Sequence, residues 1–168
     1  MIMTKYARLA SLVCAGLFAG FLTGVLVLEY SLRSFDGTVY TQVRLVELDS
    51  LDKLAVATLL PALIATAMLV YRSFRTKTRW LTVAALALLL LVFGLTLAVN
   101  LPINADQLHW NVQSPPTDWA RLRDRWQIAH AVRTIAAILA FAALALAPPL
   151  PTRSRTRALT ESATTFSG

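Results

Sequence analysis

The sequence has little cysteine and little charge. Cys14 is the single cysteine, which excludes an internal disulfide and any metal site built from paired cysteines. Charged residues make up only 15% of the 168 residues, 57% are hydrophobic and the mean hydropathy is +0.59, so an ordinary soluble protein is excluded. The sequence also has no internal repeat and no glycine-rich phosphate loop. What it does have is long apolar runs.

The apolar residues are gathered into four blocks, at about 7–28, 54–71, 80–99 and 128–146. Each block has about 18 to 22 residues, which as a helix crosses roughly 30 Å of hydrocarbon. Away from their ends, Arg133 is the only charged residue in these blocks. Because backbone amides in lipid need internal hydrogen-bond partners, the sequence predicts an all-α bundle of four membrane-spanning helices. We expect a membrane domain over residues 1–151 and a disordered cytoplasmic tail over residues 152–168.

The first apolar block has two interpretations. Lys5 and Arg8 precede it, as basic residues precede the apolar core of a signal peptide. The block is longer than such a core, however, and Gly16, Gly20 and Gly24 recur at the four-residue spacing that lets membrane helices approach closely. We therefore interpret it as a packed transmembrane helix.

The charged residues between the blocks predict an orientation. Nine basic residues and one acid precede the first block, join the second to the third, or follow the fourth, whereas seven basic and eight acidic residues lie on the other side. By the positive-inside rule, both termini are cytoplasmic and the two long loops face outward. The net charge of +7 thus reflects topology and contact with anionic lipid head groups, and we expect no nucleic-acid partner. The expected location is the bacterial plasma membrane.

The second helix is expected to begin well before its apolar core. Residues 40–53 mix polar and apolar side chains, and Gln42, Asp49 and Lys53 recur at helical spacing. This polar extension would hang over the outer mouth of the bundle. Pro61, inside the apolar core, is expected to kink the helix.

The third helix is expected to end near Asn100. Pro102 should force the chain out of helical geometry, so that Asn100 and Asn104 bracket a turn at the outer membrane boundary. Asn100 alone could serve simply as a helix C-cap. Two asparagines around a proline favour a functional turn.

The fourth helix is predicted from Asp118, a capping residue that follows two prolines, to Ala147, which precedes two more. Its roughly 45 Å exceeds the thickness of the hydrocarbon, so its first turns must rise above the membrane or cover a cavity. Polar and aromatic side chains recur along it at three- and four-residue spacing and share one face: Arg123, Trp126, His130, Arg133 and Thr134. A polar stripe is therefore expected to descend into the bundle.

His130 is the strongest candidate for a reactive residue, because imidazole exchanges a proton near neutral pH and also binds metals. The alternative is a buried structural histidine. Arg133 is ionisable at membrane depth, which by itself suggests function. It could instead extend to the head groups or form a structural ion pair with Glu29.

A metal site is a second hypothesis for the same region. His109 and His130, with Glu47 or Asp49, would supply two histidines and one carboxylate. The spacing of these residues matches no recognised ligand pattern. His109 beside Trp110 is more typical of an interfacial anchor.

A motif Asn-Leu-Pro-Ile-Asn, followed by the spacing Trp-x-x-x-His-x-x-Arg, resembles the anthrone oxygenase-like family of small four-helix membrane proteins. Characterised members oxidise anthrones to anthraquinones in polyketide pathways, using molecular oxygen and no identified organic cofactor. The resemblance implies a shared set of site residues, which are Asn100, Asn104, Trp126, His130 and Arg133. The chain departs from the family pattern around Gln42, where it offers Arg44, Glu47 and Asp49 instead.

The resemblance implies an oxygenase that acts on an aromatic or other small specialised metabolite. His130 would be the general base, and Arg133 with the amides of Asn100 and Asn104 would stabilise the developing oxyanion. Glu47 or Asp49 would orient the imidazole. The substrate, a hydrophobic molecule arriving from the bilayer, would also contact a further group of residues, namely Trp126, Gln42, Asp49 and Glu29.

Two other functions stay open from the sequence. One is a metal-assisted tailoring reaction on a different small metabolite, with a transition metal bound by His130 or His109. The other is a non-enzymatic accessory or binding subunit whose outer loops dock a partner. Transport is less well supported, because no internal repeat suggests alternating access. Association into a homo-oligomer is also left open.

Overall fold

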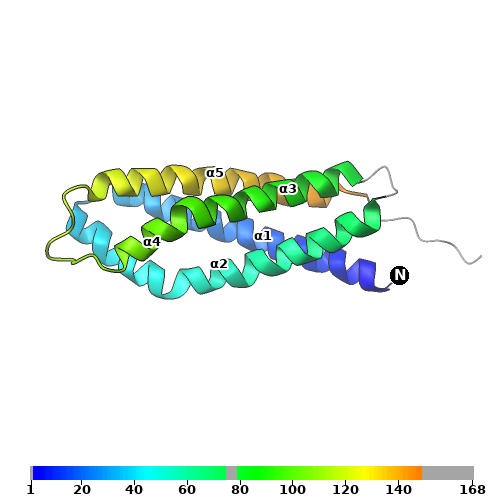
Figure 1. The fold of residues 1–168 in the computed structure, drawn as a ribbon, viewed down its shortest axis with the longest axis horizontal. Coiled ribbons are helices and arrows are strands. Elements are labelled where there is room, and N and C mark those ends of the chain that lie inside the picture. The colour runs from blue at the N-terminus through cyan, green and yellow to red at the C-terminus, as the bar shows by residue number, and fades with distance from the viewer. Residues whose placement is uncertain (1, 75–78, 149–168) are drawn as a thin grey trace, which may run out of the picture.

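Four long helices form an antiparallel bundle in the computed structural model, which describes residues 2–74 and 79–148 (Figure 1). The elements are α1 (Ile2–Ser31), the 3-10 turn η1 (Leu32–Ser34), α2 (Gly37–Ser73), α3 (Arg79–Leu95), the π turn η2 (Thr96–Asn100), α4 (Leu101–Gln107) and α5 (Trp119–Leu146). The four spans are long and apolar enough to cross a membrane, so the prediction of an all-α, four-helix integral membrane protein is confirmed. The tail predicted over residues 152–168 lies outside the described residues.

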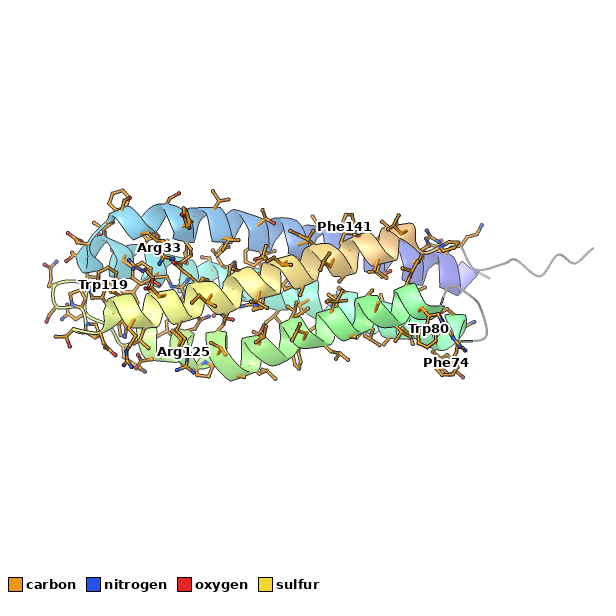
Figure 2. All side chains as sticks on the ribbon, turned by 90° about the horizontal axis from the view of Figure 1, so that it is seen from above. Arg33, Phe74, Trp80, Trp119, Arg125 and Phe141 are labelled. Carbon is orange, nitrogen blue, oxygen red and sulfur yellow. The ribbon has the colours of Figure 1, made fainter. Side chains whose placement is uncertain are left out.

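The four long helices are arranged in a ring, so that each one packs against two neighbours. α1 packs against α2 and α5, and α3 together with its extension packs against α5 and α2. The start of α1, the end of α2, the start of α3 and the end of α5 lie at one end of the bundle (Figure 1). At that end Phe74 and Trp80 are exposed, and Trp119 marks the opposite end (Figure 2). Aromatic side chains at both ends are typical of membrane interfaces. The side of the membrane that each end faces remains a prediction.

The glycine stripe on α1 contacts another helix at only one of its three positions. A Cβ added at Gly16 would lie 3.1 Å from the ring of Phe141 on α5, whereas one added at Gly20 or Gly24 would meet nothing within 4 Å. A four-residue step on an α-helix turns by about 40° beyond a full circle, so the stripe drifts away from the α1–α5 contact. The prediction that this block is a packed transmembrane helix holds for α1, with Gly16 as the glycine that packs against another described helix.

The second helix begins early, as predicted. Asp36 caps it, and its carboxylate accepts a hydrogen bond from the backbone N–H of Val39 at 3.0 Å. α2 then runs through the polar segment and through Pro61 without ending. The polar segment of α2 is therefore part of the bundle itself, at the end where α4 and the start of α5 are found (Figure 1).

The third helix does not end at Asn100, which corrects the sequence prediction. The π turn Thr96–Asn100 leads directly into α4, with Pro102 in the first turn of that helix. Proline is tolerated in the first turn of a helix, because its fixed φ suits the helix and the N–H that it lacks is not required there. Asn100 and Asn104 consequently lie one turn apart on a continuing helix and do not bracket a loop.

The fourth helix has the predicted limits within one residue. Asp118 occupies the N-cap position, and its carboxylate accepts a 2.7 Å hydrogen bond from Arg121, which lowers the pKa of this exposed group. The side chains expected to share a face are buried from the second turn onward: Trp126, His130, Arg133 and Thr134. Arg123 instead packs over the ring of Trp119, 5.0 Å from its centroid.

Gly37, the first residue of α2, makes the closest approach to an aromatic ring and supports one prediction. A Cβ there would lie 2.8 Å from Nε1 of Trp119, whose ring in turn packs on Tyr40 with centroids 5.5 Å apart. We expect Gly37→Ala to push Trp119 off Tyr40 and destabilise the protein by about 1–3 kcal/mol, measured by thermal unfolding in detergent. The matched control is Gly20→Ala, which meets open space and should be neutral or slightly stabilising. Equal melting temperatures for Gly37→Ala and the wild type would contradict this packing.

Candidate functional site

A cavity lies between the helices in the half of the bundle that contains α4. Its empty volume is about 620 Å³, including the part open at its mouth. Its apolar lining comes mainly from α1 and α2 and includes Phe21, Leu22, Val25, Leu48 and Leu51. The polar residues of the lining, called the polar wall below, are Arg44, Glu47, Asp52, Asn100, Asn104, His130 and Arg133. A cavity lined by both kinds of side chain suits an apolar molecule that carries a few polar groups.

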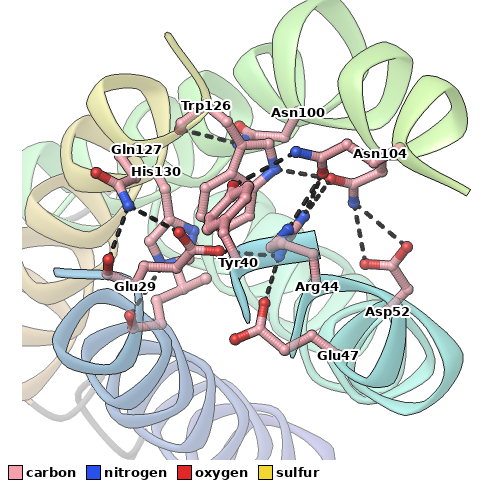
Figure 3. Close-up of polar contacts among 12 residues, drawn as sticks. Glu29, Tyr40, Arg44, Glu47, Asp52, Asn100, Asn104, Trp126, Gln127 and His130 are labelled. Carbon is pink, nitrogen blue, oxygen red and sulfur yellow. Dashed lines mark hydrogen bonds and ion pairs between the residues drawn. The ribbon is translucent and has the colours of Figure 1, made fainter. Parts of the chain in front are cut away.

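Arg44 is the centre of the polar wall (Figure 3). Its guanidinium forms ion pairs with Glu29, at 3.2 Å, and with Glu47, and only 3% of its side chain is exposed. It also donates hydrogen bonds to the side-chain oxygens of Asn104 at 3.0 Å and Gln107 at 2.9 and 3.1 Å. A buried arginine needs such a shell of acceptors, so these contacts join α1, α2 and α4 into one network.

Trp126 packs against two of the polar residues. The guanidinium of Arg44 lies 4.2 Å from the centre of the indole, and the imidazole of His130 stacks on it with ring centroids 4.7 Å apart and planes 9° from parallel. The indole N–H donates to the Asn104 side-chain oxygen at 2.7 Å. Trp126 therefore fixes the imidazole plane, in addition to lining the cavity.

His130 is oriented by a backbone carbonyl. Its Nε2 lies 3.0 Å from the carbonyl oxygen of Leu22 on α1, and a carbonyl can only accept, so Nε2 carries the hydrogen. In the neutral ring, Nδ1 then bears a free lone pair, and this buried atom has no hydrogen-bond partner among the described residues. The expectation that Glu47 or Asp49 orients the imidazole is wrong, because Glu47 is engaged by Arg44 and Asp49 is exposed. The geometry fits a base that accepts a proton at Nδ1.

Arg133, one helical turn beyond His130, is buried and forms no ion pair among the described residues. Only 5% of the residue is exposed, it lines the cavity, and its Nε has no hydrogen-bond partner in the described parts of the chain. The expected pair with Glu29 is not formed, because Glu29 is held by Arg44 and by Gln127, whose amide donates to it at 2.8 Å. A buried guanidinium with free donors is an attractive position for an anionic or developing negative group.

The two asparagines have different positions in the network. The side-chain oxygen of Asn104 accepts from Arg44 and Trp126, and its amide donates to both carboxylate oxygens of Asp52 at 3.2 and 3.3 Å, so it is engaged at both ends. Asn100 donates to the Trp126 carbonyl at 3.3 Å, but its side-chain oxygen is buried without a partner within the described residues. Asn100 is thus the asparagine with a free acceptor for a bound molecule.

A sequence model of the anthrone oxygenase family matches residues 51–143, which is more than half of the chain. The chain belongs to the anthrone oxygenase family. No match was found among curated proteins or among solved structures. The matched region of this family member contains Asp52, both asparagines and the buried face of α5. Arg44 and its two carboxylates precede that region.

Four residues predicted for the site of this anthrone oxygenase family member do not line the cavity. Gln42 and Asp49 are exposed on α2, and His109 is exposed after α4. Glu29 is buried beside the cavity, where Arg44 and Gln127 hold it. Within residues 2–74 and 79–148, no group of three or more His, Cys, Asp or Glu side chains is arranged to hold a metal ion. The proposed set of His109, His130 and a carboxylate is therefore not assembled.

Several residues of this site were missed from the sequence. Asp52 lines the cavity, and Arg44, which also lines it, was noticed but given no role. Three more belong to the hydrogen-bond network around Arg44 and Glu29: Tyr40, Gln107 and Gln127. The signal for Gln107 was its spacing of seven from Asn100 and three from Asn104, which places all three on one face of a helix. That signal is visible only if the helix continues past Pro102. Arg44 and Glu47, at a spacing of three, were likewise recognisable as one face of α2.

Proposed function

We propose that the protein is a membrane-embedded oxygenase that oxidises an anthrone-like aromatic metabolite with molecular oxygen. Membership of the anthrone oxygenase family supports an oxygenase-like role. The observation that carries the proposal is the pairing, in one cavity, of a free imidazole lone pair on His130 with the unpaired guanidinium of Arg133. A base and a cation side by side suit a substrate that must lose a proton and bear negative charge.

The reaction follows from that pairing. Nδ1 of His130 takes one proton from the methylene carbon of the anthrone. The electron pair delocalises through the central ring onto the ketone oxygen, which becomes a phenolate. Arg133 stabilises this oxyanion. The carbanion then gives its electrons to molecular oxygen and forms a carbon–oxygen bond. Loss of the second methylene proton with cleavage of the O–O bond releases water and leaves the quinone carbonyl, so one oxygen molecule yields one carbonyl and one water.

The mouth of the cavity supports a substrate that dissolves in lipid. Its exposed lining residues are Asp52 and Val56 on α2 and Leu101 on α4. They lie where the polar extension of α2 gives way to its apolar span, so the mouth would open near the boundary between head groups and hydrocarbon. From the positive-inside rule, we infer that this level lies near the outer face of a bacterial plasma membrane.

The direct test is oxygen consumption by the purified protein in detergent or nanodiscs, supplied with a hydroxylated anthrone and compared with the uncatalysed rate. We expect one molecule of oxygen consumed for each quinone formed. Oxygen uptake at the uncatalysed rate for a series of anthrones would contradict the proposal.

Arg133→Gln is expected to lower kcat by about 10²-fold or more, because the amide cannot supply the full charge that stabilises the oxyanion. Arg133→Lys should retain part of the activity, since it keeps the charge without the planar donor fork. Initial rates of quinone formation measure both. Asp49→Asn, at an exposed position on α2, is the control and should match the wild type. Full activity of Arg133→Gln would exclude this role.

A further inference from the structure

Two buried carboxylates share one arginine beside the cavity. Glu29 is 0% exposed and Glu47 is 5% exposed, and both pair with the same nitrogen, Nη1 of Arg44. Glu29 comes from the end of α1 and Glu47 from α2, so residues far apart in the sequence meet at one point (Figure 3). Because one oxygen of each carboxylate contacts this single nitrogen, the two carboxyl groups lie close to one another.

The hydrogen bonds around this pair leave one place for a proton. Oε2 of Glu29 accepts from Gln127 at 2.8 Å, and Oε2 of Glu47 accepts from Arg44. Oε1 of each glutamate is buried and has no hydrogen-bond donor among the described residues, although Oε1 of Glu29 faces Arg44 in the ion pair. Two ionised carboxylates would leave these acceptors unsatisfied. With one proton bound, the protonated Oε1 of one glutamate can donate a hydrogen bond and Oε1 of the other can accept it.

The charges around the pair favour the same state. The groups that face it are Tyr40 and Arg44 from α2, Asn104 and Gln107 from α4, and Gln127 and His130 from α5. Only Arg44 forms an ion pair with the glutamates in the described structure. With both glutamates ionised, the cluster would carry one uncompensated negative charge in a buried, low-dielectric environment, which is strongly unfavourable. One bound proton makes the cluster neutral.

We propose that Glu29 and Glu47 share one proton in the resting protein, and that Glu47, which lines the cavity, donates it during turnover. The shared proton follows from the pair itself, whereas its use in turnover rests on the proposed oxygenase function. After oxygen adds to the substrate carbanion, Glu47 protonates the outer peroxide oxygen. The resulting carboxylate then removes the second methylene proton as the O–O bond breaks and hydroxide leaves. His130 returns its proton to that hydroxide, so water is released and both residues recover their starting states.

Infrared spectroscopy of the membrane-reconstituted protein tests the shared proton without any substrate. We expect a carbonyl stretching band of a protonated carboxyl group that shifts in D₂O. Because either glutamate alone would be neutralised by Arg44, the band should disappear in both Glu29→Gln and Glu47→Gln. The matched control is Asp52→Asn, which removes an exposed carboxylate near the mouth and should leave the band in place. A wild-type protein without the band, or a band that survives both substitutions, would overturn the proposal.

The second arm separates the donor role from a structural one. Without oxygen, the wild type should exchange the methylene hydrogens of an anthrone for deuterium through His130. Glu47→Gln should keep this exchange, while its quinone formation falls by about 10²-fold. Loss of both reactions, or of neither, would overturn the donor role. If the band is present but the wild type neither exchanges nor oxidises anthrones, the proposed function fails and the shared proton stands. If the wild type oxidises anthrones but shows no such band, the proposed function stands and the shared proton is excluded.

Discussion

His130→Gln is expected to lower kcat for anthrone oxidation by about 10²–10⁴-fold, the range typical for loss of a general base. The glutamine amide can still donate to the Leu22 carbonyl, as Nε2 of the imidazole does at 3.0 Å. What it lacks is the basic lone pair that the histidine presents at Nδ1. The bundle should therefore remain folded while proton abstraction stops.

Two measurements separate this role from a structural one. Oxygen uptake and anaerobic deuterium exchange into the anthrone should fall together in His130→Gln, because both need the first proton to be removed. His109→Gln is the matched control, since this second histidine is exposed and does not line the cavity. A His130→Gln protein with wild-type oxygen uptake and an unchanged melting temperature would leave His130 as a packing residue.

Arg44→Met is expected to give the largest loss of stability, about 3–5 kcal/mol, because it removes one partner from a buried ionic cluster. The substitution keeps much of the side-chain length but removes the cation shared by the two glutamates and one donor from the side-chain oxygens of Asn104 and Gln107. It also removes the cation that packs 4.2 Å from the centre of the Trp126 ring. Thermal unfolding in detergent should show a large drop in melting temperature.

Removing the carboxylate charges should restore much of that stability. In the triple variant Arg44→Met, Glu29→Gln, Glu47→Gln, the stranded charges are absent, so its melting temperature should lie well above that of Arg44→Met alone. Such non-additivity is the signature of residues in one network. Arg125→Met is the control, because Arg125 is exposed on α5 and should contribute little (Figure 2). Melting temperatures that are equal for Arg44→Met and Arg125→Met would contradict the central position of Arg44.

The number and extent of the membrane helices could be predicted because lipid imposes a simple requirement. A spanning segment must satisfy its backbone internally and must be apolar over roughly 30 Å, so four long apolar blocks predict four helices. The buried face of α5 could be predicted for a similar reason. Trp126, His130 and Arg133 are unusual within an apolar span, and their spacing places them on one side of a helix.

The partners of those residues could not be predicted, because they depend on how each helix is rotated about its axis. Glu29 was a reasonable partner for Arg133 by depth in the membrane, yet Arg44 holds it instead. The sequence carries no signal for the carbonyl of Leu22 as the partner of His130 either, since every helical residue has a carbonyl. The prediction of a helix end near Pro102 was wrong, because a π turn precedes this proline and the chain continues as α4.

The π turn Thr96–Asn100 also sets the direction in which the residues after it face. A π turn holds about one residue more than an α turn, so it takes in an extra residue with little change in the total rotation of the helix. If a single residue were deleted there, the helix could close into regular α geometry, and Asn104 and Gln107 would still face Arg44. If the turn closed without that deletion, both side chains would rotate by about 100° and face away. A relative that is one residue shorter at this point could therefore keep the same polar wall on a regular helix.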